Sequence, residues 1–388
     1  MKWTNKGHEF DSVYEELKRK EHFYLFGTGM YGEAMYEEVT KLGDDIAGYI
    51  DNNPAKQHTL FHEKEVFALD EIDMSNDNTA IIVCVSPLLR KEIIAQLQIK
   101  GYMYNKDFYT MEVYMSLKYV YGLQKMYISS ISFLPSVKCN LNCEACLNFT
   151  PYLKNVVPRP WDEVKKDLDV FFSVVDYIML FHISGGEPFI YPQIGELLTY
   201  MGEHYRDKIH YLQIVTNGTI NIKDEHLELL KKYDIGITID DYRDAVPSCK
   251  ENFARLVERV KKYGIRHDVN KVDEWIDLAP LTTDHSDWSE LRLQKHYESC
   301  GAPWKDLKDG RICSCNYASY ASVAGFVEEY EDENFDLTTY TKAQMKELME
   351  FRLGYSEKGY VEFCKKCAGF VDINENIVQP AKQCERKN

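Results

Sequence analysis

The sequence has no hydrophobic run long enough to cross a membrane. A membrane-spanning helix needs about 20 consecutive apolar residues, whereas the best apolar stretch, Ser173–Ile183, is broken by Asp176. No apolar segment follows Lys2 and Lys6, so we expect no signal peptide and a cytoplasmic location. The sequence also has no excess of basic residues: it contains 46 Lys and Arg and 62 Asp and Glu, which gives a net charge of −16. This balance argues against a non-specific nucleic-acid binder.

The length and composition indicate a globular protein with more than one domain. The chain has 388 residues, of which 45% are hydrophobic and 28% charged. At roughly 150 residues per domain, this length corresponds to two or three domains. We expect three, at residues 1–115, 116–295 and 296–388.

The first of these domains is predicted to be a Rossmann-like α/β unit. Its expected strands are three short apolar runs, Phe23–Phe26, Ile46–Ile50 and Ala80–Val85. Gly27, Gly29 and Gly32 follow the first strand with the spacing G-x-G-x-x-G, and Asp51 ends the second. Such a loop lets a pyrophosphate approach a helix N-terminus while the acidic residue binds a ribose hydroxyl. We therefore predict a bound nucleotide, with a purely structural or partner-docking role as the alternative.

The middle domain is predicted to be a second α/β series that starts near Tyr127. Strands alternate with helices in a pattern typical of a complete or partial barrel, in which the chemistry lies at the C-terminal ends of the strands. The expected strands are Ile128–Phe133, Tyr177–Ile183, Tyr211–Val215, Gly236–Ile239 and Ile265–Val269.

The eleven cysteines carry most of the chemical information. An odd number cannot all pair as disulfides, and clustered cysteines in a cytosolic chain more often bind metal or do redox chemistry. Cys139, Cys143 and Cys146 follow the first barrel strand. Three soft thiolates suit a [4Fe–4S] cluster and leave one iron open, as catalysis requires. The same spacing would also place buried cysteines on one helix face, but Pro135, Asn140 and Asn142 favour a loop.

This loop resembles the cluster motif C-x3-C-x2-C of the radical SAM superfamily. Further resemblances follow the next strands in the expected order: Ser184-Gly185-Gly186-Glu187-Pro188, Thr216-Asn217-Gly218 and Asp240-Asp241-Tyr242. The fold implied is a partial (β/α)6 barrel. One departure is Ala145, where the family usually has an aromatic residue near the adenine.

The resemblance implies that S-adenosylmethionine binds the open iron and is cleaved to methionine and a 5′-deoxyadenosyl radical. Gly185, Gly186 and Glu187 would hold the methionyl amine, and Asn217 and Asp241 would contact the ribose or carboxylate. A flavodoxin or ferredoxin would supply the electron.

The last domain is small and rich in cysteine, so we expect a bound metal to provide stability that its small hydrophobic core cannot. Cys300, Cys315, Cys364 and Cys367 resemble the twitch variant of the SPASM extension, which implies an auxiliary [4Fe–4S] cluster. A hairpin around Asp309-Gly310 is expected to place Cys300 and Cys315 on adjacent strands. A structural zinc site is the alternative, and Cys313 could replace Cys315 as ligand.

The expected function is hydrogen abstraction from a small-molecule substrate. A carbohydrate, aminocyclitol or nucleotide sugar is favoured, because Tyr49–Pro54 resembles small domains of bacterial sugar-modifying enzymes. The reaction would be oxidation, epimerisation or dehydration. Cys249 and Cys313 are the candidate thiols for returning a hydrogen atom, and Cys384 is expected to have no role. The alternatives are a peptide-modifying radical SAM enzyme and a non-catalytic iron–sulfur or zinc sensor.

Overall fold

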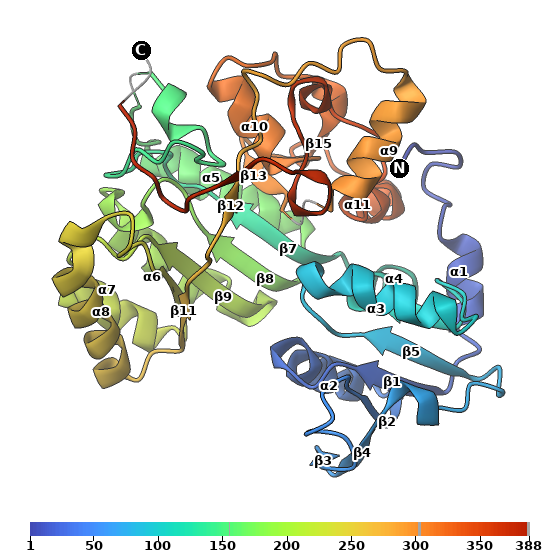
Figure 1. Ribbon diagram of the computed structural model, residues 1–388. Helices are drawn as coiled ribbons and strands as arrows, with labels where there is room; N and C mark the ends of the chain where they lie inside the picture. Colours follow the sequence, from blue (N-terminus) through green and yellow to red (C-terminus); the bar gives the residue numbers. More distant parts are fainter. Residues whose placement is uncertain (155, 302–303, 386–388) are drawn as a thin grey trace. The chain divides into compact units, whose positions relative to one another are not determined.

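The computed structural model describes residues 1–154, 156–301 and 304–385 (Figure 1). The chain forms two compact units. The N-terminal unit comprises Asn5–Tyr127 and Met345–Leu353, and the central unit comprises Met1–Thr4, Ile128–Gln344 and Gly354–Asn388. Within the described ranges, no helix combines the length and apolarity needed to cross a bilayer.

The N-terminal unit is built on a six-stranded sheet in the order β3-β4-β2-β1-β5-β6. Neighbouring strands are parallel except β3 and β4. Without the short β3, the order along the sheet is that of doubly wound dinucleotide-binding folds. The strands are β1 (His22–Phe26), β2 (Asp45–Ile50), β3 (Leu60–Phe61), β4 (Lys64–Phe67), β5 (Thr79–Val83) and β6 (Phe108–Thr110). The helices are α1 (Asp11–Leu17), α2 (Met30–Leu42), α3 (Pro87–Ile99) and α4 (Met111–Leu117).

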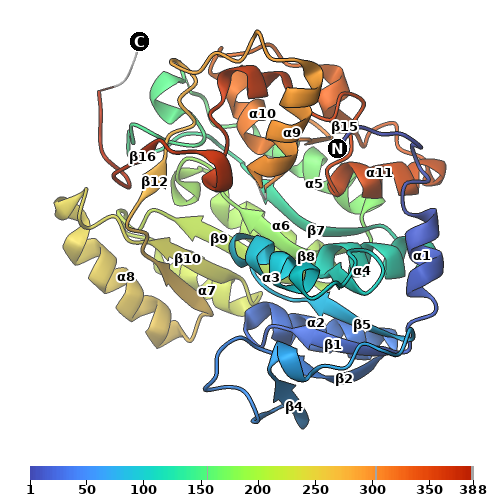
Figure 2. The same ribbon diagram turned by 45° about the vertical axis from the view of Figure 1, so that its right-hand side comes forward.

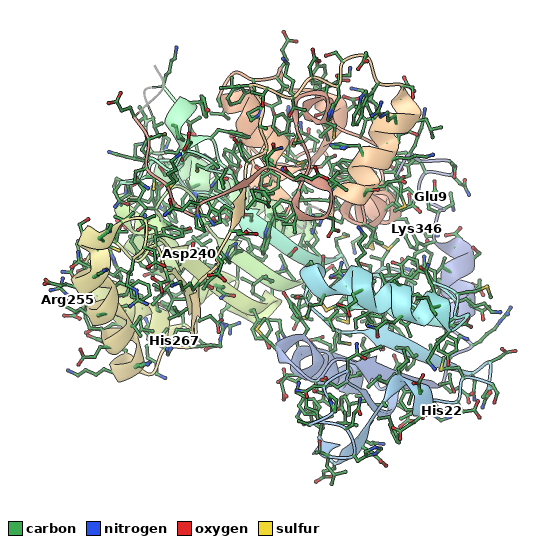
Figure 3. The ribbon with its side chains drawn as sticks, in the orientation of Figure 1. Glu9, His22, Asp240, Arg255, His267 and Lys346 are labelled. Atoms are coloured by element: carbon green, nitrogen blue, oxygen red, sulfur yellow. The ribbon has the colours of Figure 1, made fainter. Side chains whose placement is uncertain are left out.

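A helix from late in the chain completes this unit. Glu350, on α11 (Met345–Arg352), is buried and accepts hydrogen bonds from the backbone N–H groups of Gly7 (2.7 Å) and Glu9 (2.8 Å). Lys346 forms an ion pair with Asp11 at 2.7 Å, and Figure 3 shows Lys346 close to Glu9. Residues far apart in sequence therefore belong to one unit, which the sequence-based boundaries do not anticipate.

The central unit contains an eight-stranded sheet in the order β11-β10-β9-β8-β7-β13-β14-β15. The five strands predicted for the barrel are all present, and helices flank the β9–β11 end of the sheet (Figures 1 and 2). Its strands are β7 (Tyr127–Phe133), β8 (Tyr177–Ile183), β9 (Ile209–Thr216), β10 (Gly236–Asp240), β11 (His267–Asn270), β13 (Asp306–Lys308), β14 (Arg311–Cys313) and β15 (Asn334–Asp336). The helices are α5 (Trp161–Val174), α6 (Ile194–His204), α7 (Asp224–Lys232), α8 (Lys250–Tyr263), α9 (Glu290–Cys300) and α10 (Asn316–Val323). A separate pair of strands joins β12 (Trp275–Ile276) to β16 (Ile377–Val378).

The sheet continues past the five barrel strands through the predicted hairpin. Strand β13 pairs in parallel with β7, and β14 returns antiparallel to β13. Asp309 and Gly310 form the turn with φ of 53° and 71°, the left-handed backbone that a two-residue hairpin turn requires. Asp167 on α5 accepts hydrogen bonds from the backbone N–H groups of both turn residues, at 3.1 and 2.7 Å. The hairpin is therefore fixed to the barrel by one buried carboxylate.

Replacing Asp167 with Ala is expected to lower the free energy of unfolding by about 2–3 kcal/mol. Asp167 is buried and also pairs with Arg159 at 2.7 Å, so its loss leaves two N–H donors and a largely buried cation without their partner. Chemical denaturation checks this. The matched control is Lys166→Ala, an exposed position on the same helix, for which a change within about 0.5 kcal/mol is expected. Equal stability of the two variants contradicts the prediction.

Candidate functional site

The three cysteines of the C-x3-C-x2-C motif lie in the loop that follows β7. The loop folds as successive tight turns, with Cys146 N–H bonded to the Cys143 carbonyl (3.1 Å) and Phe149 N–H to the Cys146 carbonyl (2.9 Å). Residues 134–149 form no helix, so the predicted loop is confirmed and the helical alternative is wrong.

The loop brings the three thiols into one apolar pocket. Their shared neighbours, drawn from the loop itself, the end of β10 and two later segments, are Leu141, Tyr242, Ala245, Val246, Trp275 and Ala381. Burial raises the pKa of Cys139 and of Cys143 to about 12. Because metal-bound cysteine is a thiolate, insertion of a metal group must release these protons.

Each sulfur of the loop has a polar neighbour at hydrogen-bond distance. Cys139 Sγ accepts from the Leu141 N–H (3.4 Å) and from Asn217 Nδ2 (3.7 Å). Gln383 Nε2 donates to Cys143 Sγ at 3.3 Å, and the Cys146 thiol donates to Thr150 Oγ1 at 3.3 Å. Donors around cluster sulfurs stabilise negative charge and tune the potential of a bound cluster.

The donor set fits an iron–sulfur cluster. In the described parts of the chain, no three His, Cys, Asp or Glu side chains converge closely enough to hold a single metal ion. The sulfur atoms that bind a [4Fe–4S] cluster can lie farther apart than those that bind a single ion, because each thiolate binds an iron atom of its own. One buried thiol and two half-buried ones that gather in one apolar cluster, with polar groups beside them, meet that requirement.

The Gly185-Gly186-Glu187 segment packs directly on the strand-to-loop connection. A Cβ at Gly185 would lie 2.4 Å from the Ser136 carbonyl oxygen, and one at Gly186 would lie 2.2 Å from the Lys138 carbonyl oxygen. Only glycine allows this approach, which the N–H groups of Gly186 and Glu187 complete by bonding to the same two carbonyls. The glycines therefore hold the backbone that leads into Cys139.

Glu187 is fully buried and joins two loops rather than facing a cavity. Its carboxylate accepts hydrogen bonds from the Asn217 N–H (2.8 Å), the Phe189 N–H (3.1 Å) and the Thr216 hydroxyl (3.1 Å). Burial raises the pKa of Glu187 to about 7. The structure thus gives this residue a task that the sequence did not predict, and its contact with a methionyl amine stays a prediction.

Of the two other predicted cofactor contacts, only Asn217 reaches the cluster loop. Besides Cys139, Asn217 Nδ2 donates to Asn140 Oδ1 at 2.9 Å. Asp241 is engaged by Arg243 in a two-bond ion pair, each bond 2.7 Å long. Asp240, at the end of β10 (Figure 3), accepts from Tyr242 and Asn270.

The four later cysteines also come together. Burial raises the pKa of the thiols of Cys315, Cys364 and Cys367, and the neighbouring sulfurs, Cys300 included, raise each of them further. Cys315 is the N-cap of α10, and the nearby backbone N–H groups of Ala318 and Tyr317 lower the pKa of its thiol against the effect of burial. Two buried and two half-buried thiols thus lie near one another, and four such ligands would leave no iron of a [4Fe–4S] cluster open.

The expected position of Cys300 and Cys315 on adjacent strands is wrong, because β14 ends at Cys313 and Cys315 is the N-cap of α10. Cys300 is the last residue of α9, and its Sγ accepts from the Phe370 N–H at 3.2 Å. The signals for this helix are present in the sequence. Ser289 caps its first turn through a bond to the Arg292 N–H, and Gly301 ends it with a left-handed φ of 65°.

Two histidines that the sequence analysis did not single out hold the Cys364–Cys367 turn. His285 Nδ1 lies 3.1 Å from the Cys364 carbonyl oxygen, and His296 Nε2 lies 3.1 Å from the Cys367 carbonyl oxygen. Trp288 stacks on the His285 ring at 3.6 Å. Both imidazoles are therefore oriented by packing to donate an N–H to main-chain carbonyls of two predicted ligands.

Cys313 lines one hollow together with Cys315, and Cys249 lies in the turn before α8. Cys313 is buried against Asp306 and Ser319, and burial raises its pKa well above the ordinary value. Cys249 is buried beside Asp241, where burial and the nearby carboxylate raise its pKa. The hydrogen-atom role of both thiols stays a prediction.

In the N-terminal unit, two of the three motif glycines serve packing. A Cβ at Gly27 would lie 2.6 Å from the Cys84 carbonyl oxygen, and one at Gly32 would lie 2.0 Å from the Gly27 carbonyl oxygen. Gly29 alone has open space beside it. Asp51, the predicted ribose ligand, accepts hydrogen bonds from the Thr28 N–H (3.2 Å) and hydroxyl (2.5 Å) and pairs with Lys56 at 3.1 Å. Nucleotide binding in this unit stays a prediction.

Comparisons with known proteins point to one superfamily. The sequence model of the Radical SAM superfamily matches residues 133–275. The antilisterial bacteriocin subtilosin biosynthesis protein AlbA of Bacillus subtilis is 30% identical over 133 residues, which is 32% of this chain and 28% of AlbA. SuiB of Streptococcus suis, solved with its precursor peptide SuiA, is 20% identical with a TM-score of 0.30, over 47% of this chain and 45% of SuiB. Native anSMEcpe with bound AdoMet is 13% identical with a TM-score of 0.43, over 65% of this chain and 93% of that protein.

The chain spans less than half the length of AlbA and of SuiB. The matched region begins at the end of β7 and runs to Trp275, so it contains the cysteine loop and the three polar motifs that follow β8, β9 and β10. This family uses a [4Fe–4S] cluster held by three cysteines together with S-adenosylmethionine. The chain therefore carries a radical SAM domain, the catalytic domain of radical SAM enzymes, in residues 133–275.

Proposed function

We propose that this chain is a radical SAM enzyme that modifies a peptide. The observation that carries the proposal is the gathering of Cys139, Cys143 and Cys146 in one partly buried apolar cluster inside the matched domain. When bound, the cluster supplies one electron that cleaves S-adenosylmethionine to methionine and a 5′-deoxyadenosyl radical, which takes a hydrogen atom from the substrate. A small ferredoxin or flavodoxin would deliver that electron.

The chain's own residues would bind the cluster, place hydrogen-bonding groups beside its cysteine sulfurs and keep water away from them. Three thiolates would bind three of the four irons, and the side chains of Asn217, Gln383 and Thr150 lie within hydrogen-bond distance of those sulfurs. Tyr242 and Trp275 pack beside the thiols with rings 5.5 Å apart, so bulk water is kept from that side. We assign the methionyl and ribose contacts to Gly185, Gly186, Glu187, Asn217 and Asp241 as predictions.

A second cluster on Cys300, Cys315, Cys364 and Cys367 is part of the proposal. Four thiols leave no iron open, so this site would pass electrons rather than bind substrate. Four thiols are also the ligand set of a structural zinc ion, which makes zinc the competing occupant. In the described parts of the chain no three of these side chains converge closely enough for a single ion, which favours the cluster.

The peptide substrate is supported by the relative that is 30% identical, a bacteriocin biosynthesis protein. A small hollow of about 10 Å³, room for about one water molecule, lies beside Cys146, and Phe149, Tyr152, Leu278 and Pro280 are among the residues that line it. Ala145, the small residue that departs from the family pattern, also lines this hollow.

A carbohydrate or nucleotide sugar is the second candidate substrate. The strand order of the N-terminal unit and the open space at Gly29 favour it, because both are features of nucleotide-binding folds.

The experiment is anaerobic reconstitution followed by dithionite and S-adenosylmethionine. Formation of 5′-deoxyadenosine is expected without substrate, and peptides encoded beside this gene should increase its rate more than nucleotide sugars do. Stimulation by nucleotide sugars alone would replace the peptide by the second candidate. No cleavage by a cluster-loaded chain rejects the enzyme and supports the non-catalytic sensor.

A further inference from the structure

A short segment near residue 383 pairs with the cluster loop of the central unit. The Glu144 N–H bonds to the Lys382 carbonyl at 2.8 Å, and the Cys384 N–H bonds to the Asn142 carbonyl at 2.9 Å. Cys143 and Gln383 form an antiparallel bridge between these bonds. We call residues 381–384 the strap. Ala381, at its start, is fully buried against the loop residues Leu141 and Cys143.

The pairing decides which strap side chain faces the cluster site. Side chains of adjacent residues in a paired segment point to opposite faces, so residues 143 and 383 share one face and residues 142 and 384 share the other. The contacts agree, because Asn142 Nδ2 reaches Cys384 Sγ at 3.6 Å while Gln383 Nε2 reaches Cys143 Sγ at 3.3 Å. The Cys384 thiol is therefore on the wrong face to act as a fourth ligand, and Gln383 is on the right one.

The Gln383 amide is held in one orientation by main-chain groups. Its Oε1 accepts the Asn142 N–H at 2.9 Å, so the oxygen must be on that side of the amide. Its Nε2 donates to the Ala381 carbonyl at 2.6 Å, which leaves the second N–H for the sulfur of Cys143. The partners thus decide which end of the amide is nitrogen, and that end faces the cluster ligand.

We propose that Gln383 is a positioning residue for the cluster bound by Cys139, Cys143 and Cys146, an inference that rests on the proposed function. Its N–H donates to the Cys143 thiolate, holds that ligand in place and raises the reduction potential of the cluster. The physical reason is that reduction adds negative charge to the cluster and its sulfurs, and an N–H dipole stabilises that charge.

Among the described residues, Gln383 is the side chain that donates to Cys143, whereas the other two loop cysteines have different partners. Asn217 and the Leu141 N–H serve Cys139, and Thr150 lies beside Cys146. Removal of the Gln383 amide therefore changes the surroundings of one particular ligand. The nearby ion pair between Lys382 and Glu144, at 2.7 Å, is more than 40% exposed at both side chains and does not touch a sulfur.

The test compares Gln383→Met, Gln383→Glu and Lys382→Ala with the wild-type holoenzyme. The readout is a potentiometric EPR titration of the cluster whose signal changes when S-adenosylmethionine is added, because only a cluster with an open iron responds. Gln383→Met keeps the side-chain length without the donor, and a more negative potential is expected. Iron loss to a chelator should be about 10-fold faster. Gln383→Glu keeps the shape but places an acceptor at the sulfur, so its potential should be at least as negative.

The control separates the amide from the strap as a whole. Lys382→Ala alters the same segment without altering the bond to sulfur, and it should keep the wild-type potential and iron-loss rate. The inference is overturned if both Gln383 variants match the wild type, or if Lys382→Ala shifts the potential as much as they do. A wild-type chain with no S-adenosylmethionine-responsive signal would instead reject the proposed function.

Discussion

Replacing Cys143 with Ala will reduce 5′-deoxyadenosine formation to the rate of the reagents alone. It will also lower the iron content from about eight to about four atoms per chain, the difference of one [4Fe–4S] cluster. The thiol is buried at the centre of the pocket that Cys139 and Cys146 share. When one of its three cysteine ligands is removed, the cluster has two irons without a protein ligand and dissociates from the chain. Iron and sulfide analysis of the anaerobically reconstituted chain, followed by the cleavage assay, measures both effects.

Cys384→Ala is the matched control for this change. Cys384 is a cysteine within the strap next to the same loop, but its side chain lies with Asn142 on the opposite face of the pairing. It should keep about eight irons and the full cleavage rate. Retention of cleavage in Cys143→Ala would contradict the assignment of the open-iron cluster. Loss of a cluster in Cys384→Ala would show that the face assignment is wrong.

The central strands and the cluster loop could be predicted because their signals are local. Tyr177–Ile183 is an apolar run of strand length between turn residues, and the structure gives β8 the same bounds. The spacing of Cys139, Cys143 and Cys146, with Pro135 and two asparagines nearby, was enough to predict a metal-binding loop. Each of these features depends on neighbours within about ten residues.

The residues that complete the sites could not be found in this way. Gln383 contacts a cysteine 240 positions earlier, and His285 contacts a carbonyl 79 positions later. No spacing rule connects such pairs, because tertiary packing alone brings them together. The same reason applies to Glu350, which bonds to the N–H of Gly7 across 343 positions. A division into consecutive domains cannot represent a unit completed by a helix from the other end of the chain.

For Glu187, the sequence motif was recognised, but it did not predict the hydrogen bonds that the side chain makes. The motif was recognised from its sequence and its place after a strand, and the implied contact was with a ligand. The structure shows that its carboxylate already accepts bonds from Thr216, Asn217 and Phe189. A sequence motif identifies the residue type that a position needs, whereas the partners of a fully buried carboxylate follow from the packing of two loops.

Replacing Cys364 and Cys367 together with Ala will remove the auxiliary cluster and leave the cleavage of S-adenosylmethionine in place. Iron should fall from about eight to about four atoms per chain, this time with the S-adenosylmethionine-responsive EPR signal retained. Cleavage should continue because the two clusters are held by different cysteines. These thiols share a pocket with Cys300 and Cys315, and none of the cluster-loop cysteines is among their electrostatic neighbours. Turnover of substrate should be lost, because hydrogen abstraction leaves a substrate radical, and the electron that this radical must still give up then has no acceptor.

Cys313→Ala supplies the control that makes this result specific. Cys313 is buried two residues from Cys315, but its hydrogen-bonding partners are Asp306 and Ser319 rather than the four thiols. It should keep about eight irons, and loss of a cluster there would mean that Cys313 replaces Cys315 as a ligand. If the wild type holds about four irons and one zinc, and the double variant loses only the zinc, the site is structural. The electron-transfer role then fails while the radical SAM domain stands, because the two sites draw on different cysteines.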